Sequence, residues 1–247
     1  GELAGEARPG RRLLYHAAMG LLAGLSGFVE YQAGIFCAVF AACLLARSAR
    51  RPLGAIVFLA SAAAFVALLL WYNRRCFGGP FELSYHHLAP AMQDRHGFGI
   101  GGVSYPRITR LGAALFSLHR GLFVMSPLFA FVFPGVFFLW KAGNRTHAVA
   151  IGATFTGFVL YVSGAAVWHG AWAFGPRLLV PVLGIAAVPV ACALQRFRGC
   201  PLANGLAAGC AAVAILGHQV THLVFPELPP GCRNPLVALV VPALGQG

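Results

Sequence analysis

Apolar runs recur along this chain, and short segments rich in arginine and proline separate them. Each run approaches the length of about 20 residues that a helix needs to cross the hydrocarbon core of a bilayer. A single run of this kind would fit a signal sequence, but here the runs continue almost to the end of the chain. The pattern therefore predicts an all-α fold, a polytopic bundle of transmembrane helices.

The composition excludes a soluble globule. Hydrophobic residues make up 59% of the chain and charged residues 10%, whereas soluble domains carry about 25% charged residues. The net charge of +12 would suit nucleic-acid binding only if a soluble face carried a basic patch. Since the sequence offers no such domain, we expect membrane lipids, and not nucleic acid, as partners of the basic residues.

We expect a single membrane domain, residues 1–247, with about seven spans. The first run, residues 13–46, is too long for one span, so we place a turn at residues 28–31. This turn brings Glu30 near the surface, because a carboxylate in the middle of a bilayer costs about 3 kcal/mol or more. The predicted spans are residues 13–28, 32–46, 53–72, 121–140, 147–167, 178–195 and 203–224.

Lysine and arginine predict the orientation, because they concentrate in short cytoplasmic loops. Short basic segments near residues 8–12, 47–51, 141–145 and 196–198 are therefore placed inside. The turn at Glu30, the long loop 73–120 and residues 168–177 then lie outside.

The outer loop 73–120 contains a stretch with helical periodicity, residues 107–119. Its apolar residues share one helical face, with Arg107 and Arg110 on another. The apolar residues are Ile108, Leu111, Leu115 and Leu118. The stretch predicts an amphipathic helix that lies in the outer membrane interface.

Three acidic residues on the predicted outer side are candidates for catalysis: Glu30, Glu82 and Asp94. An enzyme that transfers or hydrolyses glycosyl groups needs a carboxylate as base or metal ligand. Ionisable residues close to the membrane core are usually functional, which favours Glu30. For the two loop residues the alternative is ion pairing with arginines of the same loop, namely Arg74, Arg75 or Arg95.

Residues 168–177 gather aromatic and polar side chains between two spans. Arg177 opens the following span, as Arg120 does in an earlier one, and a guanidinium binds phosphoryl oxygens in a bidentate manner. Trp168, His169 and Trp172 are candidates for contact with a lipid-linked ligand. The alternative is an aromatic belt with an arginine that anchors the helix at the membrane surface.

Metal and disulfide sites are weakly indicated. His218 and His222 are spaced to share a helix face, but Gln219 stands where zinc proteases have glutamate. We therefore favour a polar seam between helices over a metal site, and predict no cofactor, with a divalent metal left open. Cys76 and Cys232 both fall in predicted outer segments, and their pairing stays open because sequence alone does not fix the geometry.

Four motifs resemble the C-terminal part of bacterial multi-spanning glycosyltransferases of the GT-C type, in the dolichyl-phosphate-mannose mannosyltransferase-like group. They are Gly20-Leu-Leu-Ala-Gly-Leu with Glu30-Tyr31, Tyr72-Asn73 with Phe77-Gly-Gly-Pro-Phe-Glu-Leu-Ser-Tyr85, Arg120-Gly-Leu-Phe-Val-Met-Ser-Pro127, and residues 168–181. The resemblance implies sugar transfer from a polyprenyl-phosphate donor at the outer face of the bacterial cytoplasmic membrane. The positions that it carries over are Arg120, Trp168 and Arg177, with Glu30-Tyr31 and the loop from Tyr72 to Tyr85. Our candidates for donor binding are Arg177, Arg120, Trp168, His169, Trp172 and Tyr85.

The family's catalytic carboxylate lies in a long outer loop after the first span, and this chain has no such loop early on. We therefore expect either that an N-terminal part is missing or that this copy has lost catalysis. Two other function classes stay open. A transporter or flippase of a lipid-linked or small polar substrate would need ionisable residues within spans, for which His16 and His218 are candidates. A non-catalytic envelope protein would fold without binding lipid phosphate.

Overall fold

The computed structural model describes residues 9–47, 52–88, 99, 102–170, 175, 177–224, 232, 234, 237–238 and 241–245. Within these residues every regular element is a helix, and the one β-bridge joins Val103 to Ala165. The all-α prediction is confirmed. The chain divides into two compact units, Gly1–Gln93 and Asp94–Gly247, which are described separately below as unit 1 and unit 2.

Unit 1 is built on a close pairing of α1 with α3. Its elements are α1 (Pro9–Val29), η2 (Tyr31–Ala33), α2 (Gly34–Arg47), α3 (Leu53–Phe77) and η3 (Ser84–His87). A Cβ atom on Gly20 would overlap the carbonyl oxygen of Phe58, and one on Gly24 would lie 2.7 Å from that of Ala62. Small residues spaced four apart let two membrane helices approach backbone to backbone, so these glycines determine the α1–α3 crossing.

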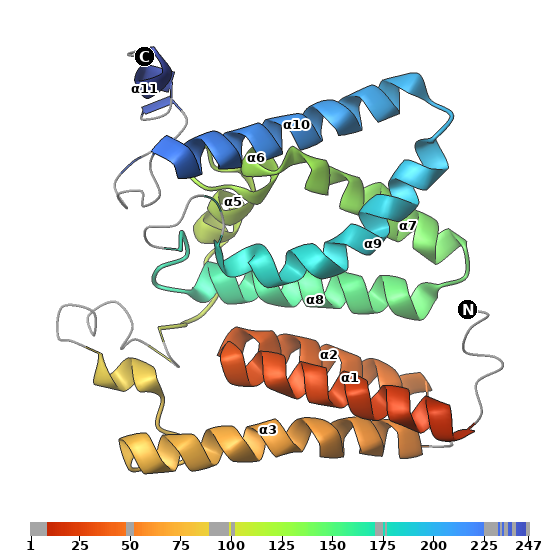
Figure 1. Cartoon of the computed structure of the whole chain (residues 1–247), viewed down its shortest axis with the longest axis vertical. Helices are drawn as coiled ribbons and strands as arrows, with labels where there is room; N and C mark the ends of the chain where they lie inside the picture. The colour runs from red at the N-terminus through yellow and green to blue at the C-terminus, as the bar shows by residue number, and fades with distance from the viewer. Residues whose placement is uncertain are drawn as a thin grey trace. The chain divides into compact units, whose positions relative to one another are not determined.

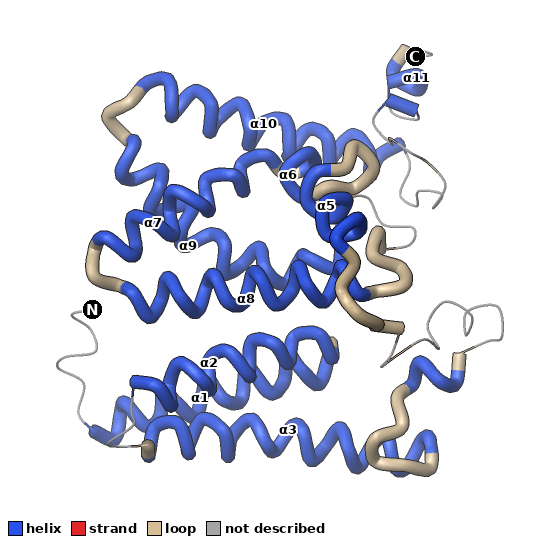
Figure 2. The backbone as a smooth tube through the Cα atoms, turned by 180° about the vertical axis from the view of Figure 1, so that it is seen from behind, coloured by secondary structure: helices blue, strands red, loops and turns tan. Residues whose placement is uncertain are grey.

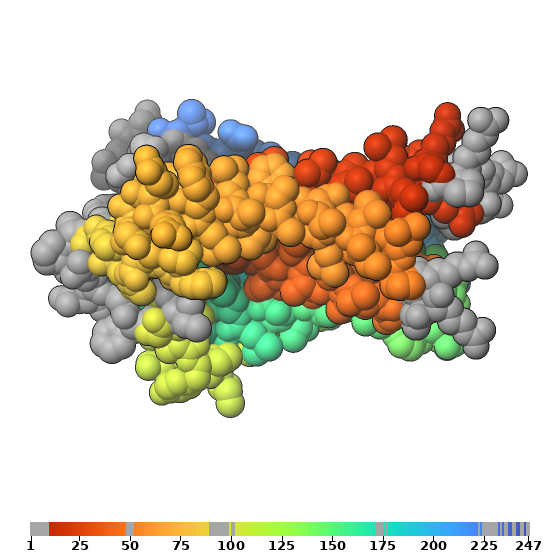
Figure 3. Space-filling model, turned by 90° about the horizontal axis from the view of Figure 1, so that it is seen from below, coloured from red at the N-terminus to blue at the C-terminus, as the bar shows by residue number. Residues whose placement is uncertain are grey.

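One face of unit 1 is formed largely by α3 (Figure 3). Large hydrophobic side chains are exposed on it, among them Leu53, Ile56, Leu59, Val66, Leu68 and Trp71. Soluble proteins rarely expose a continuous apolar patch of this size. The exposed apolar side chains of α3 are therefore suited to contact with lipid.

Unit 2 contains four longer helices and several short ones. They are α5 (Ile108–Phe116), α6 (Leu122–Met125), η4 (Pro127–Phe131), α7 (Val132–Lys141), α8 (Arg145–Gly164), η5 (Arg177–Leu179), α9 (Val180–Phe197), α10 (Pro201–Val224) and α11 (Val241–Leu244). The α7–α8 and α9–α10 connections lie at one end of this unit, and α5, α6 and the turn after α8 lie at the other (Figures 1 and 2).

The core of unit 2 lies between α7 and its neighbours α8 and α9. Val132 packs with Ala186 and Val190 of α9, and Leu139 with residues of α8. Pro189 lies inside α9, where it cannot donate a backbone hydrogen bond. The same three helices, α7, α8 and α9, therefore form the core and extend to both ends of the unit.

Five helices are long and apolar enough to cross a membrane: Gly10–Val29, Leu53–Phe77, Arg145–Gly164, Arg177–Phe197 and Pro201–Thr221. Between 6% and 44% of each of their most apolar windows is buried within the structure, so most of these side chains face outward. The protein is a helical integral membrane protein. Shorter apolar helices, Tyr31–Arg47 and Pro127–Lys141, occupy the two other predicted spans, and the count of seven stays a prediction.

Two of the helices in the structure have other bounds than the spans predicted from the sequence. The predicted span 121–140 is broken at Ser126, whose φ and ψ of −141° and 69° leave the helical region because the next residue is proline. The helix that contains the third predicted span continues beyond residue 72, to Phe77. Arg74 and Arg75 suit the negative end of a helix, and Gly78, with φ of 84°, terminates it.

The helix predicted at residues 107–119 is present as the shorter α5. Its C-cap, Ser117, is in an extended conformation, which ends the helix before Leu118. The position of α5 at a membrane surface stays a prediction.

Candidate functional site

The C-terminal end of α8 is closed by residues 102–110 of the preceding segment. The last carbonyl groups of a helix have no partner within it, and here this segment supplies donors. The pairs are Ser104 N–H to Gly164 O (3.0 Å), Arg107 N–H to Ser163 O (3.3 Å) and Arg110 Nη1–H to Ala165 O (2.8 Å). These bonds fix where the chain leaves α8 and enters the turn at residues 166–170.

Arg120 joins that turn to the one before α6. Its side chain is 0% exposed. Nη1 donates a hydrogen bond to the carbonyl oxygen of His169 at 2.9 Å and lies 3.4 Å from Nδ1 of the same residue. Desolvation lowers the pKa of Arg120, while Cys232 acts in the opposite direction. A buried cation is costly unless it is hydrogen-bonded, so this contact is a structural requirement of the site.

Three rings pack beside the Arg120 guanidinium. The imidazoles of His119 and His169 stack with centroids 5.9 Å apart, and the Trp168 ring lies edge-on to both, at 6.2 and 5.8 Å. The pKa of His119 is lowered by burial and then by Arg120 and His169, so the neutral imidazole predominates at pH 7. Nε2 of His119 is buried and has no hydrogen-bond partner among the described residues.

Arg177, unlike Arg120, is exposed. A Cβ atom on Gly170 would lie 3.0 Å from the Cβ of Arg177, so η5 begins directly beside the His169 turn. Gly170 has φ of 76°, a conformation that glycine adopts without strain. The structure therefore brings Arg120, Trp168, His169 and Arg177 to one end of unit 2. Trp172 lies outside the described residues.

This cluster has a strongly positive environment. The acidic residues of unit 2 are Asp94 and Glu227, and both lie outside the described residues. The described residues of unit 2 therefore offer Arg177 no carboxylate partner, and an exposed guanidinium can bind an oxyanion through two parallel N–H donors. The arrangement is therefore suited to a phosphate group.

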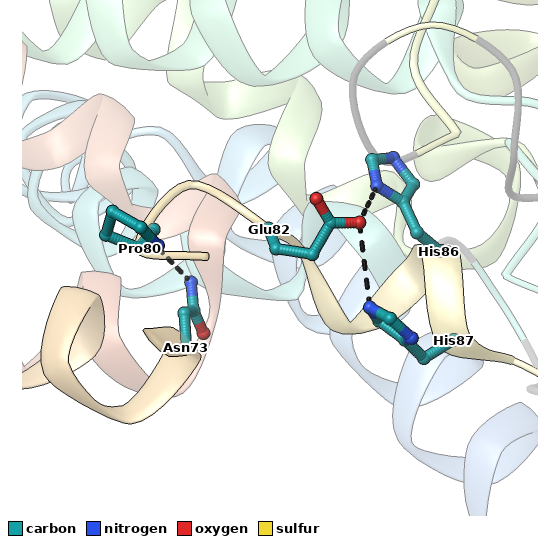
Figure 4. A network of polar contacts seen from close by, with 5 residues as sticks. All are labelled: Asn73, Pro80, Glu82, His86 and His87. Carbon is teal, nitrogen blue, oxygen red and sulfur yellow. Dashed lines mark hydrogen bonds and ion pairs between the residues drawn. The ribbon is translucent and has the colours of Figure 1, made fainter. Parts of the chain in front are cut away.

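The remaining candidates lie in unit 1, where Glu82 contacts two histidines (Figure 4). Its Oε1 is 2.9 Å from Nδ1 of His86 and 3.6 Å from Nε2 of His87. The expectation that Arg74 or Arg75 pairs with Glu82 was wrong: the helix extension places those arginines on α3, and the η3 turn folds its own histidines back onto the carboxylate.

Glu30 is exposed at the predicted turn, where α1 ends and η2 begins. Its backbone carbonyl accepts a hydrogen bond from Ala33 N–H at 2.8 Å. Tyr85 also belongs to unit 1, and its ring lies edge-on to that of Tyr31 at 6.0 Å. Asp94 falls outside the described residues.

Sequence reasoning did not select Gln32 or Asn73 as site residues. Their side chains are 6% and 2% exposed, and neither amide oxygen has a hydrogen-bond partner within the described part of the chain. Asn73 Nδ2 donates to the carbonyl oxygen of Pro80 at 3.4 Å (Figure 4). In the sequence, each of these residues is an amide at the edge of an apolar run. Burial of an amide without hydrogen-bond partners is unfavourable, and this could have marked both as candidates.

Metal and disulfide expectations can be compared with the described residues. No three His, Cys, Asp or Glu side chains come together there as a metal site. Cys76 and Cys232 are both free thiols. A Cβ atom on Gly175 would lie 3.4 Å from the His218 ring, and the polar seam on that helix stays a prediction.

No protein-family model, curated protein or solved structure matches the chain. The resemblance to GT-C glycosyltransferases therefore stays an expectation that depends on the four sequence motifs.

Proposed function

We propose that the protein binds the phosphate of a polyprenyl-phosphate-linked sugar at the end of unit 2 that carries Arg120 and Arg177, as a GT-C-like glycosyltransferase does. The observation that carries the proposal is the contact between buried Arg120 and the His169 turn, with exposed Arg177 beside it. One cation holds the turn, and the other is available to a ligand. We place this end at the outer face of the bacterial cytoplasmic membrane, from the distribution of basic residues.

The chemistry assigns separate roles to these residues. Arg177 contacts the phosphate in a bidentate manner and stabilises it as the leaving group. Trp168 is half-buried in the adjacent turn and offers a ring for the sugar or for the first prenyl unit.

Sugar transfer also needs a base for the acceptor hydroxyl. The candidates are Glu30, Glu82 and Asp94, of which Asp94 belongs to unit 2. Sequence alone supports this part of the proposal.

A sugar-transfer assay tests the proposal. The full chain in nanodiscs is supplied with a polyprenyl-phosphate-linked sugar and an acceptor pool extracted from membranes. Arg177→Ala should reduce the rate of transfer by about 100-fold, because the negative charge that develops on the phosphate leaving group in the transition state would lose its hydrogen-bond donor. Arg47→Ala is the matched control, since Arg47 is an exposed arginine at the end of α2 in unit 1, and it should retain full activity. Equal rates for wild type and both variants, including no transfer by any of them, would contradict the proposed activity.

A further inference from the structure

A cavity with a polar lining lies at the end of unit 2 opposite to the Arg120 and Arg177 cluster. It has a volume of about 800 Å³ and lies where α7 and α9 end and α8 begins. Its polar lining consists of three cations and two amides: Lys141, Arg196, Arg198, Asn144 and Gln195. This cavity shares no residue with the Arg120 and Arg177 cluster.

The charge of this cavity is unbalanced. Unit 2 has no carboxylate among its described residues, so the three cations have no ion-pair partner there. Lys141 Nζ lies 5.6 Å from the centroid of the Phe137 ring, and Arg196 Cζ lies 6.0 Å from that of Phe138. Ring contacts of this kind leave the N–H donors free to bind an anion.

The start of α8 adds to the positive potential. Asn144 precedes the helix, makes no side-chain cap and lines the cavity. The first turn contains Arg145 and no acidic residue. Because the N-terminal end of a helix carries partial positive charge, an anion in this cavity is stabilised by α8. The C-terminal ends of α7 and α9 favour cations in their last turns, which explains how Lys141 and Arg196 are tolerated close together.

An apolar groove adjoins the cavity and shares Lys141 with it. The groove, about 570 Å³ in volume, is lined by Phe133, Val136, Phe137 and Trp140 of α7, with Lys141 and Arg145 at one end. The apolar residues are spaced three and four apart, so they share one face of α7. The aromatic side chains are 46–59% exposed. A cationic cavity next to an exposed apolar groove matches a ligand with an anionic head and a hydrocarbon chain.

We infer that this end of unit 2 binds an anionic phospholipid. The phosphate contacts Lys141, Arg196 and Arg198, and an acyl chain lies along the Phe133–Trp140 face of α7. The apolar groove distinguishes this ligand from free phosphate. Basic residues place this end on the cytoplasmic side, where anionic lipids concentrate. The inference does not rest on the proposed glycosyltransferase function.

Native mass spectrometry of the full chain, purified in detergent, tests the site. Phosphatidylglycerol and phosphatidylcholine with the same acyl chains are titrated separately. Wild type should prefer phosphatidylglycerol by about tenfold or more, and Arg196→Gln/Arg198→Gln should lose that preference. Arg74→Gln/Arg75→Gln is the matched control, because it removes two adjacent exposed arginines at the end of α3 in unit 1, and it should retain the preference.

Three results would overturn the inference. One is the absence of a preference in wild type, and another is an equal loss in both double variants, which would indicate general attraction by net charge. The third is displacement of the bound lipid by millimolar inorganic phosphate, which would indicate a free-phosphate site. Arg196→Lys/Arg198→Lys should restore the preference in large part, and its circular dichroism spectrum should match that of wild type.

Discussion

Arg120 Nη1 donates a hydrogen bond to the carbonyl oxygen of His169 at 2.9 Å, between residues 49 positions apart in the chain. This bond ties the turn that precedes α6 to the turn that follows α8. The guanidinium is fully buried, whereas Arg177, beside the same turn, is exposed. The two arginines therefore have different roles, one in holding the site and one in binding.

Arg120→Ala should destabilise the protein by about 2–4 kcal/mol, because it removes a charge-assisted hydrogen bond and leaves a cavity. The midpoint of thermal unfolding in detergent measures this loss. Arg177→Ala serves as the control and should leave the midpoint within about 1 °C of wild type, because exposed side chains contribute little to stability. Equal midpoints for the two variants would contradict the structural role of Arg120.

Gly164→Ala should displace the segment that closes α8. A Cβ atom at this position would lie 2.6 Å from the carbonyl oxygen of Ser104, and overpacking of this kind costs about 1–3 kcal/mol. Hydrogen exchange at the amides of Ser104 and Arg107 should become faster. Gly152→Ala, in the same helix with no atom within 4 Å of the added Cβ, should leave their protection unchanged and favour the helix slightly. Unchanged exchange in Gly164→Ala would show that the segment is held in another way.

Gly20→Leu should separate α1 from α3, because the added side chain would overlap the backbone of Phe58. A loss of about 1–3 kcal/mol or more is expected, and faster proteolysis within unit 1 measures it. Gly10→Leu is the control on the same helix, since no atom lies within 4 Å of its Cβ position. If both variants resist protease like wild type, the close α1–α3 crossing is incorrect.

His119 should make stability depend on pH. Its pKa in the folded protein is lowered from 6.5, so the unfolded chain binds the proton more readily. Stability should therefore be complete above about pH 6.5 and decrease as the pH falls toward the lowered pKa of the folded state. Unfolding midpoints between pH 5 and pH 8 measure this, and His119→Gln should flatten the curve in the acid range. A variant with the same acid sensitivity as wild type would assign the effect to other groups.

The sequence predicted the helices of this protein well, because span-length apolar runs leave a membrane chain few alternatives. The turn at Glu30 was also predicted, since a carboxylate avoids the bilayer core. The extension of α3 to Phe77 was not, because polar residues in the last turn resemble a loop. Helix-end electrostatics and Gly78 favour the helix there.

The site was predictable only in part. Arg120 and Arg177 both stand before apolar runs, and nothing in the local sequence distinguishes a buried from an exposed guanidinium. Burial of Arg120 depends on the carbonyl of His169, and the Arg110 contact to Ala165 spans 55 residues. Such bonds follow from how α5 packs on α8 and how the turn before α6 meets the His169 turn, which no local pattern encodes. The pairing of Glu82 with His86 was likewise a consequence of the η3 turn.

The most direct test of the central claim is equilibrium binding of a polyprenyl phosphate to the full chain in nanodiscs of zwitterionic lipid. Wild type and Arg47→Ala, which removes an exposed arginine at the end of α2 in unit 1, should bind with the same dissociation constant. Arg177→Ala should bind about tenfold or more weakly, because a charge-assisted bidentate contact is lost. Equal dissociation constants for all three proteins would contradict a lipid-phosphate site at Arg177.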